Sequence, residues 1–247
     1  MRIDRREKNP YPYNIMSDQS EAVVRHVAMI MDGNRRWAHE QGLSSVEGHR
    51  EGYENMKRIG DWCLERGVLS LSVFAFSTEN WKRSETEVNF LMAILEQALG
   101  KELNYFIERK VRLRVLGRKE GFSKKIQKLI DDAEEATKDF DRMTFGICLN
   151  YGGRFELVDA VKSLMVAGVS AESVDESAIA KHLYWPDMPD PDLVIRTSGE
   201  RRLSGFLTWQ TVYSELYFTD VYWPAFDEKE LDKAFEVFKT RQRRFGK

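Results

Sequence analysis

Residues 26–38 read HVAMIMDGNRRWA, and this stretch decides the fold. The run from His26 to Met31 is apolar over the length of a buried strand, and it stops abruptly at Asp32 and Gly33. Two arginines follow, at the place where the next helix would begin. The stretch therefore predicts a buried strand, a tight turn and the first turn of a helix, which together begin an α/β unit.

The same alternation continues along the chain. Apolar runs predict six strands, at residues 26–31, 69–76, 111–116, 143–149, 192–195 and 215–221. Helical patterns separate most of these runs, so we expect an α/β fold of one domain, residues 21–247, with a mainly parallel six-stranded sheet flanked by helices. Residues 1–20, charged and then rich in proline and tyrosine, are expected to form a mobile arm.

Three helices carry recognisable start signals. Ser84 with Glu87 predicts a capping box ahead of apolar residues at helical spacing. Ser123 precedes a second such pattern, and Asp227 with Glu230 opens the last helix.

The composition excludes several classes of protein. Hydrophobic residues make up 42% and charged residues 32%, a balance typical of folded proteins and unlike that of disordered ones. The net charge of −2 argues against nucleic acid as a partner, so any phosphate site must be local. No apolar run is long enough to span a bilayer. Cys63 and Cys148 lie in apolar contexts and are expected to be buried thiols in a reducing, cytoplasmic compartment.

Polar and cationic side chains follow three of the predicted strands. Asp32 and the two arginines follow the first strand, residues 77–83 (STENWKR) follow the second, and residues 196–204 (RTSGERRLS) follow the fifth. Carboxyl ends of parallel strands meet at one edge of a sheet, where ligands bind and helix N-termini attract anions. The pattern predicts a pocket for more than one phosphate group. The alternative for any one segment is a plain turn followed by solvated basic residues.

The common nucleotide-binding motifs are absent. The sequence has neither a GxxxxGK[ST] loop nor a GxGxxG turn that opens a helix. A carboxylate beside phosphates indicates Mg²⁺, and Asp32 is the first candidate ligand. Glu215 lies in the apolar context VYSELYF and needs a partner, because an unpaired buried charge is costly. A metal ion or an arginine would each serve as that partner, and the sequence does not choose between them.

Six motifs, in unbroken order from about residue 25 to the C-terminus, resemble the cis-prenyltransferases of the undecaprenyl diphosphate synthase family. They are HVAMIMDGNRRWA, EGHREG, FAFSTENWKRSETEV, NYGGR, the segment PDLVIRTSGERRLSGFLTWQTVYSELYFTDVYWP, and RRFG near the end. The resemblance implies that the chain condenses isopentenyl diphosphate with an allylic diphosphate, with farnesyl diphosphate the expected primer. It also implies dependence on Mg²⁺, a hydrophobic tunnel for the growing chain, and a homodimer.

The resemblance further implies roles for particular residues. Asp32 and Asn80 are the expected catalytic residues, Asp32 as a Mg²⁺ ligand that helps diphosphate leave and Asn80 in proton removal. Glu215 is the expected second carboxylate of the metal. The expected substrate contacts are Gly33, Asn34, Arg35, Arg36, Trp37, His49, Ser77, Thr78, Glu79, Trp81, Arg83, Arg196, Arg202, Leu203, Ser204 and Arg244. Of these, Arg244 is expected to complete the site across the dimer.

The residue types suit this chemistry. A divalent cation and arginines stabilise the charge that grows on the departing diphosphate, and two anions must be held side by side. An amide is a poor base, so we expect Asn80 to orient the step while a diphosphate oxygen takes the proton. Candidate tunnel residues, each with ordinary core packing as the alternative, are Phe76, Phe90, Leu91, Ile94, Met143 and Phe145.

Two departures from the family pattern concern how the allylic diphosphate is held and which primer is used. Many relatives have glycine where this chain has Arg35, and many long-chain relatives have arginine where it has Ser45. The segment RRLSGFL resembles short-chain members as much as the undecaprenyl enzymes, which often have asparagine in place of Gly205. A short-chain synthase is therefore the alternative to a long-chain one. A non-catalytic partner subunit and a different Mg²⁺-dependent phosphate enzyme, such as a phosphohydrolase, are the rival functions.

Two further features of the sequence are a set of three histidines and a basic terminal segment. Three histidines have no metal-ligand spacing between them and are expected at the surface or behind the site: His26, His39 and His182. The terminal segment TRQRRFGK is expected either to serve the active site or to contact anionic lipid at a membrane surface.

Overall fold

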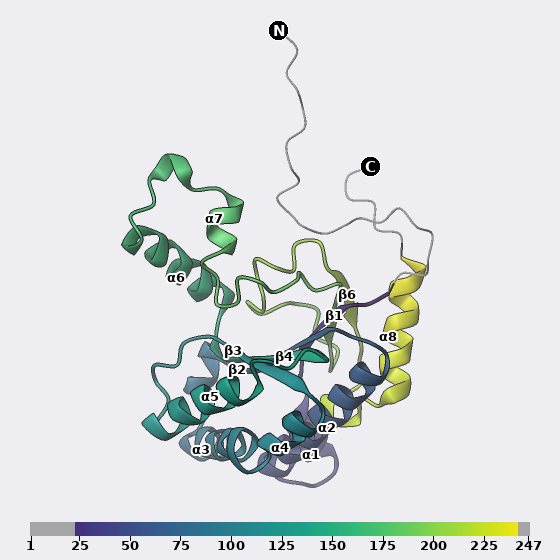
Figure 1. Ribbon diagram of the computed structural model, residues 1–247. Coiled ribbons are helices and arrows are strands. Elements are labelled where there is room, and N and C mark those ends of the chain that lie inside the picture. The colour runs from purple at the N-terminus through teal and green to yellow at the C-terminus, as the bar shows by residue number, and fades with distance from the viewer. Residues whose placement is uncertain (1–22, 242–247) are drawn as a thin grey trace.

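The computed structural model describes residues 23–241, and these contain one sheet of six strands (Figure 1). Every strand pair is parallel, and the order across the sheet is β3-β4-β2-β1-β5-β6. The strands are β1 (His26–Ile30), β2 (Ser70–Ser77), β3 (Val111–Leu116), β4 (Met143–Tyr151), β5 (Leu193–Arg196) and β6 (Glu215–Phe218). The predicted six-stranded α/β fold is confirmed. The predicted arm of residues 1–20 lies outside the described residues.

The last strand is shorter than the sequence pattern predicted. It ends at Phe218, because the chain beyond it turns toward the loop after β5. There the backbone N–H of Ser198 donates to the carbonyl of Val221, and that of Gly199 donates to the carbonyl of Thr219. This pairing ties the ends of β5 and β6 together at the carboxyl edge of the sheet.

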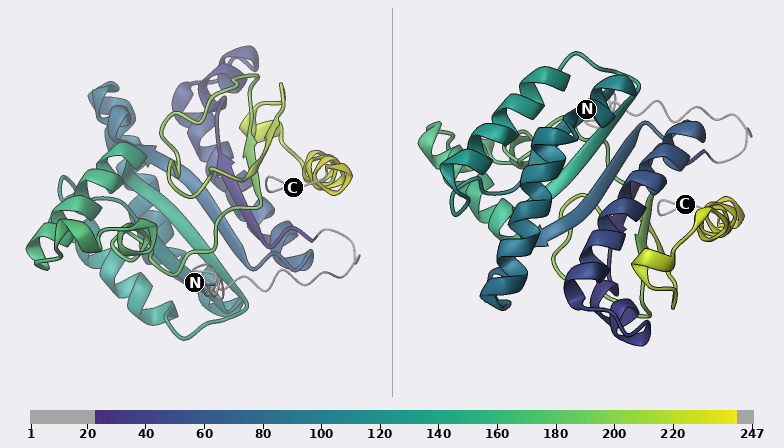
Figure 2. Two further views of the ribbon diagram at one scale, coloured as in Figure 1. Left: turned by 90° about the horizontal axis from the view of Figure 1, so that it is seen from above. Right: turned by 90° about the horizontal axis from the view of Figure 1, so that it is seen from below.

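Helices cover both faces of the sheet (Figures 1 and 2). One face carries α1 to α5, with α8 beside the β6 edge, and the opposite face carries α6, α7 and the long loop between β5 and β6. The α-helices are α1 (Asn34–Glu40), α2 (Ser45–Glu65), α3 (Glu85–Glu96), α4 (Leu103–Glu108), α5 (Lys124–Thr137), α6 (Gly153–Val166), α7 (Glu176–Ala180) and α8 (Glu228–Thr240). Shorter turns are the 3₁₀ helices η1 (Thr78–Lys82), η3 (Ala171–Ser173) and η4 (Trp223–Ala225), and a π-helical segment, η2 (Gln97–Lys101).

The sheet is buried on both faces, as expected for parallel strands that are covered by crossover helices. Successive side chains of a strand point to opposite faces, so Val27 and Met29 join the core beneath α2–α5 while Ala28 and Ile30 join the core on the other side. Cys63 and Cys148 are fully buried free thiols, as predicted. In residues 23–241 no helix has the length and apolar character needed to cross a membrane.

The helix starts are mostly as predicted, with one correction. Ser123 and Asp227 cap α5 and α8 by accepting a hydrogen bond from a backbone N–H. Ser84 caps α3 in the same way, but the predicted capping box is incomplete because the side chain of Glu87 bonds to other residues.

His26 corrects a second prediction. Its side chain is fully buried, with one ring nitrogen 2.6 Å from the carbonyl oxygen of Pro189 and the other 2.9 Å from the hydroxyl of Ser72. Burial lowers the pKa of His26 to about 4. The residue therefore belongs to the interior, where it ties the segment before β5 to β2.

The strand order explains where the site forms. From β1 the chain moves to β2 on one side, and much later it returns through β5 on the other side of β1. The loops that follow β1 and β5 therefore part from one another at the carboxyl edge. Such a switch point is where open parallel sheets bind ligands, because the diverging loops leave a crevice.

Candidate active site

Asp32 lies at this switch point, two residues beyond the end of β1. One carboxylate oxygen accepts a hydrogen bond from Arg196 (2.8 Å), the last residue of β5, and the other accepts one from Arg36 (3.2 Å). Its backbone N–H also donates to the hydroxyl of Thr197 (3.0 Å). Residues that are 164 positions apart in the chain thereby form one charged cluster.

Arg196 is the buried member of this cluster, with 4% of its surface exposed. Besides Asp32, its guanidinium donates to the hydroxyl of Ser204 (2.9 Å) and to the carbonyl oxygen of Arg202. Its Nε is buried without a hydrogen-bond partner among the described residues. The planar fork of arginine allows one side chain to fix both the carboxylate and the loop that follows β5.

Gly33 sets the path from β1 into α1. Its φ is +105°, and a β-carbon built there would lie 2.7 Å from Cδ1 of Tyr222 and 2.8 Å from Cβ of Ser198. Both the backbone conformation and the close neighbours require glycine. This turn brings Arg36 over Ser198, whose hydroxyl accepts a 2.5 Å hydrogen bond from it.

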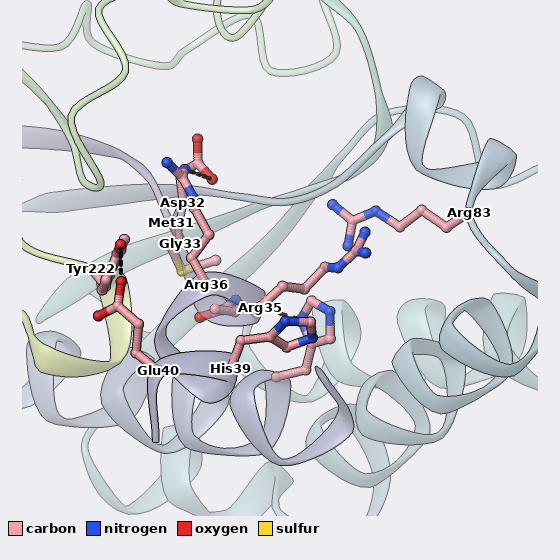
Figure 3. A pocket seen from close by; sticks show the side chains of 11 residues that line it. Met31, Asp32, Gly33, Arg35, Arg36, His39, Glu40, Arg83 and Tyr222 are labelled. Carbon is pink, nitrogen blue, oxygen red and sulfur yellow. Dashed lines mark hydrogen bonds and ion pairs between the residues drawn. The ribbon is translucent and has the colours of Figure 1, made fainter. Parts of the chain in front are cut away.

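A cavity of about 630 Å³ opens on one side of Asp32 (Figure 3). Its wall contains residues 31–36 of the first predicted motif and the end of α1, together with residues from three later parts of the chain: Met31, Asp32, Gly33, Asn34, Arg35, Arg36, His39, Glu40, His49, Arg83 and Tyr222. Arg83 extends from the end of η1 toward Arg35 on α1, so two guanidinium groups converge from different elements. We refer to this as the larger cavity.

A second cavity of about 500 Å³ opens on the other side, and we refer to it as the smaller cavity. Its wall consists of Ile30, Met31, Asp32, Phe74, Ser77, Glu79, Asn80, Arg83, Arg196 and Ser204. Met31, Asp32 and Arg83 belong to both walls. The two cavities therefore adjoin, and each contains a carboxylate and arginine side chains.

Asn80 is oriented by the start of η1. Its amide oxygen accepts a hydrogen bond from the backbone N–H of Ser77 (2.9 Å), and only the oxygen of the amide can accept there. The amide NH₂ is left as the group that Asn80 can offer to the smaller cavity. The side chain therefore acts there as a hydrogen-bond donor.

His49, in the wall of the larger cavity, and Glu87, behind that wall, form a buried pair. The His49 Nε2 lies 2.9 Å from Glu87, and the same carboxylate oxygen accepts a 2.7 Å bond from Arg83. Burial lowers the pKa of His49, although the hydrogen bond to Glu87 opposes this. Burial raises the pKa of Glu87, but His49 and Arg83 outweigh it and keep that pKa below its usual value. His49 is therefore neutral and Glu87 charged near pH 7.

Other predicted site residues lie outside the two walls: Trp37, Thr78, Trp81, Arg202 and Leu203. Trp81 instead donates its indole N–H to Asn150 (2.8 Å) and packs on Phe76. Arg202 pairs with Glu200. The predicted residue Arg244 falls outside the described residues.

Glu215 lies far from Asp32 within one chain. It is the first residue of β6 and is level with Leu193 and Val27, so it belongs to the amino edge of the sheet. Arg241 forms an ion pair with Glu215 at 2.9 Å and is therefore the partner that this carboxylate requires. The structure does not bring these two predicted metal ligands together in one chain. Among the described residues, no three His, Cys, Asp or Glu side chains converge as a metal site.

The candidate tunnel residues divide into two groups. Phe76, Met143 and Phe145 are buried in the core beneath α2–α5. Phe90, Leu91 and Ile94 lie on α3 and are partly exposed.

Sequence reasoning missed several residues of the site. Glu40 and Tyr222 line the larger cavity and hydrogen-bond to each other (2.6 Å), although 182 residues separate them. His39, expected to be peripheral, lines the same cavity. The sequence indicates Glu87 only as part of a helix start signal. A carboxylate within four residues of Arg83 was a signal that could have indicated its second role.

Comparison with known proteins gives the same family as the motifs. A family model described as "Putative undecaprenyl diphosphate synthase" matches residues 30–246. The chain belongs to the undecaprenyl diphosphate synthase family. It is a prenyltransferase.

Two curated relatives and one solved structure illustrate the likeness. The isoprenyl transferase of Thermotoga maritima is 47% identical over 226 residues, covering 91% of this chain and 97% of that protein. The farnesyl-diphosphate-specific ditrans,polycis-undecaprenyl-diphosphate synthase of Legionella pneumophila is 44% identical, covering 90% of this prenyltransferase and 94% of that one. Lavandulyl diphosphate synthase from Lavandula x intermedia, solved with dimethylallyl diphosphate, has a TM-score of 0.87 at 33% identity, covering 91% and 99% of the two chains.

Proposed function

We propose that this prenyltransferase condenses isopentenyl diphosphate with an allylic diphosphate, farnesyl diphosphate by preference, and builds a cis-polyprenyl diphosphate in a Mg²⁺-dependent reaction. The observation that carries the proposal is the pair of adjoining cavities that share Asp32 and Arg83. A condensation of two diphosphates needs two anion sites close enough for the carbon atoms to meet. A hydrolase that acts on one phosphate ester has no need for the second site.

The cavities divide the two substrates. The larger cavity contains Gly33, Asn34 and Arg36 at the start of α1, and we assign it to the allylic diphosphate. The smaller cavity contains Arg196 and Ser204, and we assign it to isopentenyl diphosphate. Loss of the allylic diphosphate creates negative charge, and the guanidinium groups around Asp32 stabilise that charge.

The residues around Asp32 fit a magnesium ion because they include a carboxylate that can serve as a ligand. Mg²⁺ is commonly held by one or two carboxylates, with phosphate oxygens and water completing its shell. Asp32 supplies one carboxylate at the wall shared by the two cavities, and two diphosphates would supply the other oxygens. When bound, the ion would neutralise charge on the leaving diphosphate.

The proton lost at the end of each condensation requires an acceptor. Asn80 presents its NH₂ to the smaller cavity because its oxygen is bonded to the backbone of Ser77. It can orient a diphosphate but cannot remove a proton through that group. We assign the role of base to an oxygen of the diphosphate itself.

The growing chain is a hydrocarbon and needs an apolar path. We assign that path to the α3 side of the sheet, where Phe90, Leu91 and Ile94 are partly exposed near the buried Phe76. Its depth sets product length. A short-chain product is the second candidate, favoured by the structural likeness to lavandulyl diphosphate synthase.

We further propose a homodimer, cytoplasmic and in peripheral contact with the membrane that receives the product. Exposed apolar side chains line one side of α6 and suit a second copy of the chain: Phe155, Val158, Val161, Met165 and Val166. Val166 has 90% of its surface exposed. Light scattering of the purified protein should give the mass of a dimer, and a monomer at micromolar concentration would contradict this assignment.

The decisive experiment is product analysis. Purified protein is incubated with Mg²⁺, labelled isopentenyl diphosphate and, separately, geranyl, farnesyl or geranylgeranyl diphosphate, with Asp32→Ala as the matched variant. Long products that fall at least about a hundredfold in the variant are expected. A short product would establish the second candidate, and no condensation with any primer would refute the proposed function.

A further inference from the structure

Glu87 lies behind the larger cavity without lining it, yet it touches three residues of the cavity wall. One carboxylate oxygen accepts hydrogen bonds from His49 (2.9 Å) and Arg83 (2.7 Å). The other lies 3.7 Å from a guanidinium nitrogen of Arg35. Glu87 is only 8% exposed, and a carboxylate buried to this extent requires such partners.

The position of Glu87 in its helix has a matched counterpart. Glu47 is the third residue of α2, and its exposed carboxylate closes a capping box with Ser44 (2.8 Å). Glu87 is the third residue of α3 and follows Ser84 in the same spacing, but its carboxylate leaves the helix end and faces the cavity wall. The helix forgoes one cap hydrogen bond there, and the three cavity partners offset that loss.

The two arginines that Glu87 contacts come from different elements and converge in Figure 3. Arg35 belongs to α1, and Arg83 follows η1. Like charges at this separation repel one another unless a counter-charge lies between them. Glu87 supplies that charge from the first turn of α3, so the arginines remain close while their free N–H groups face the cavity.

Glu87 also fixes the ring of His49. Because the neutral ring donates Nε2–H to Glu87, its Nδ1 is the acceptor, and it faces the side-chain NH₂ of Asn34 at 3.5 Å. Asn34 is the first residue of α1 and lines the larger cavity. Both ring nitrogens of His49 are directed at protein groups, so the ring holds the wall in shape.

We propose that Glu87 is a positioning residue of the allylic diphosphate site: it presents Arg35 and Arg83 as a convergent pair and orients His49 against Asn34. The proposal rests on the proposed function, in which the larger cavity binds a diphosphate. The wall is then organised before the anion arrives, and little ordering remains to be done on binding.

Two physical views of Glu87 make opposite predictions. If it acted only as a negative charge near an anion site, its removal would strengthen diphosphate binding. If it positions the arginines, its removal lets them separate and weakens binding. Glu87→Gln removes the charge and retains the shape, so it separates the two views.

The test is calorimetric titration of inorganic diphosphate into the intact protein and its variants. We expect Glu87→Gln to weaken binding roughly tenfold or more, the effect of losing charge-assisted hydrogen bonds. Ser84→Ala removes the cap of the same helix, and Glu47→Gln removes the matching carboxylate of α2. Both should lower the melting temperature and leave the dissociation constant within about twofold.

A second measurement tests the proposal even if Glu87→Gln lowers the stability of the folded protein. In a double-mutant cycle with Arg83→Met, the effect of Glu87→Gln on binding should shrink to about twofold, because residues that act through each other are not additive. In turnover, the KM for the allylic substrate should rise roughly tenfold with kcat changed much less.

The outcomes that overturn the proposal are distinct. Equal or tighter diphosphate binding by Glu87→Gln refutes the positioning role and leaves the proposed function intact. Equal weakening by Ser84→Ala assigns the effect to helix stability and also refutes it. Failure of the unsubstituted protein to bind diphosphate refutes the larger cavity as a diphosphate site, and with it the proposal.

Discussion

Gly33→Ala should be among the most damaging single-methyl changes in this protein. Gly33 joins β1 to α1 with φ +105°, a conformation that L side chains rarely adopt. The added methyl would also lie 2.7 Å from Cδ1 of Tyr222 and 2.8 Å from Cβ of Ser198. Neither neighbour can yield easily, because Tyr222 is hydrogen-bonded to Glu40 and Ser198 to Arg36.

The size of the effect follows from two separate causes. Forcing alanine into a positive φ costs about 1–2 kcal/mol. Inserting a methyl group into a packed contact costs about 1–3 kcal/mol more. The free energy of unfolding should therefore fall by roughly 2–5 kcal/mol, and the flanking Asp32 should lose its alignment with Arg196.

Gly42→Ala is the matched control. Gly42 ends the turn after α1 with φ +69°, and nothing lies within 4 Å of a β-carbon built there. It should show the conformational cost alone, about 1–2 kcal/mol. Urea unfolding of both variants measures the difference. Equal losses would refute the argument from close packing at Gly33, and a Gly33→Ala protein as stable as the parent would refute both causes.

Two further predictions concern chemistry and pH. Asn80→Asp keeps the oxygen that accepts from the Ser77 N–H but loses the amide N–H donors that Asn80 offers to the smaller cavity. The kcat should therefore fall by about 10²-fold with an unchanged melting temperature. A variant that keeps its full kcat would exclude Asn80 from orienting substrate. Burial in the folded protein lowers the pKa of His26 to about 4, whereas the ordinary value is 6.5. Between these two pH values the unfolded state binds more protons than the folded state. The free energy of unfolding therefore falls as the pH drops through this window. The loss should reach about 3 kcal/mol near pH 4 in urea titrations, and a His26→Gln variant with the same pH dependence would disprove this origin.

The strands were predictable because burial on both faces leaves a continuous apolar run in the sequence. All six appear within a few residues of their predicted bounds, and β6 ends early because Ser198 and Gly199 capture the backbone beyond it. Such apolar runs do not specify the order of the strands in the sheet. Only the packed chain shows that β5 returns beside β1 and so brings Arg196 to Asp32.

The site was predictable where chemistry and local spacing coincide. Asp32, Arg36 and Asn80 lie in the first turns that follow β1 and β2, and parallel strands end at one edge, so their approach follows from the sequence. Glu215 shows where that reasoning fails. It is the first residue of its strand rather than a residue that follows one, and the register of β6 against β5 places it at the other edge, beside Arg241.

The sequence by itself therefore determined the fold class, the edge of the sheet that bears the site and the cationic character of that site. These depend on local periodicity and on the residues that follow each strand. Tertiary structure alone decided which charges meet. Glu87 has the sequence context of a capping residue, yet its carboxylate serves His49 and Arg83, because ion pairing depends on distances in space that residue spacing along the chain does not set.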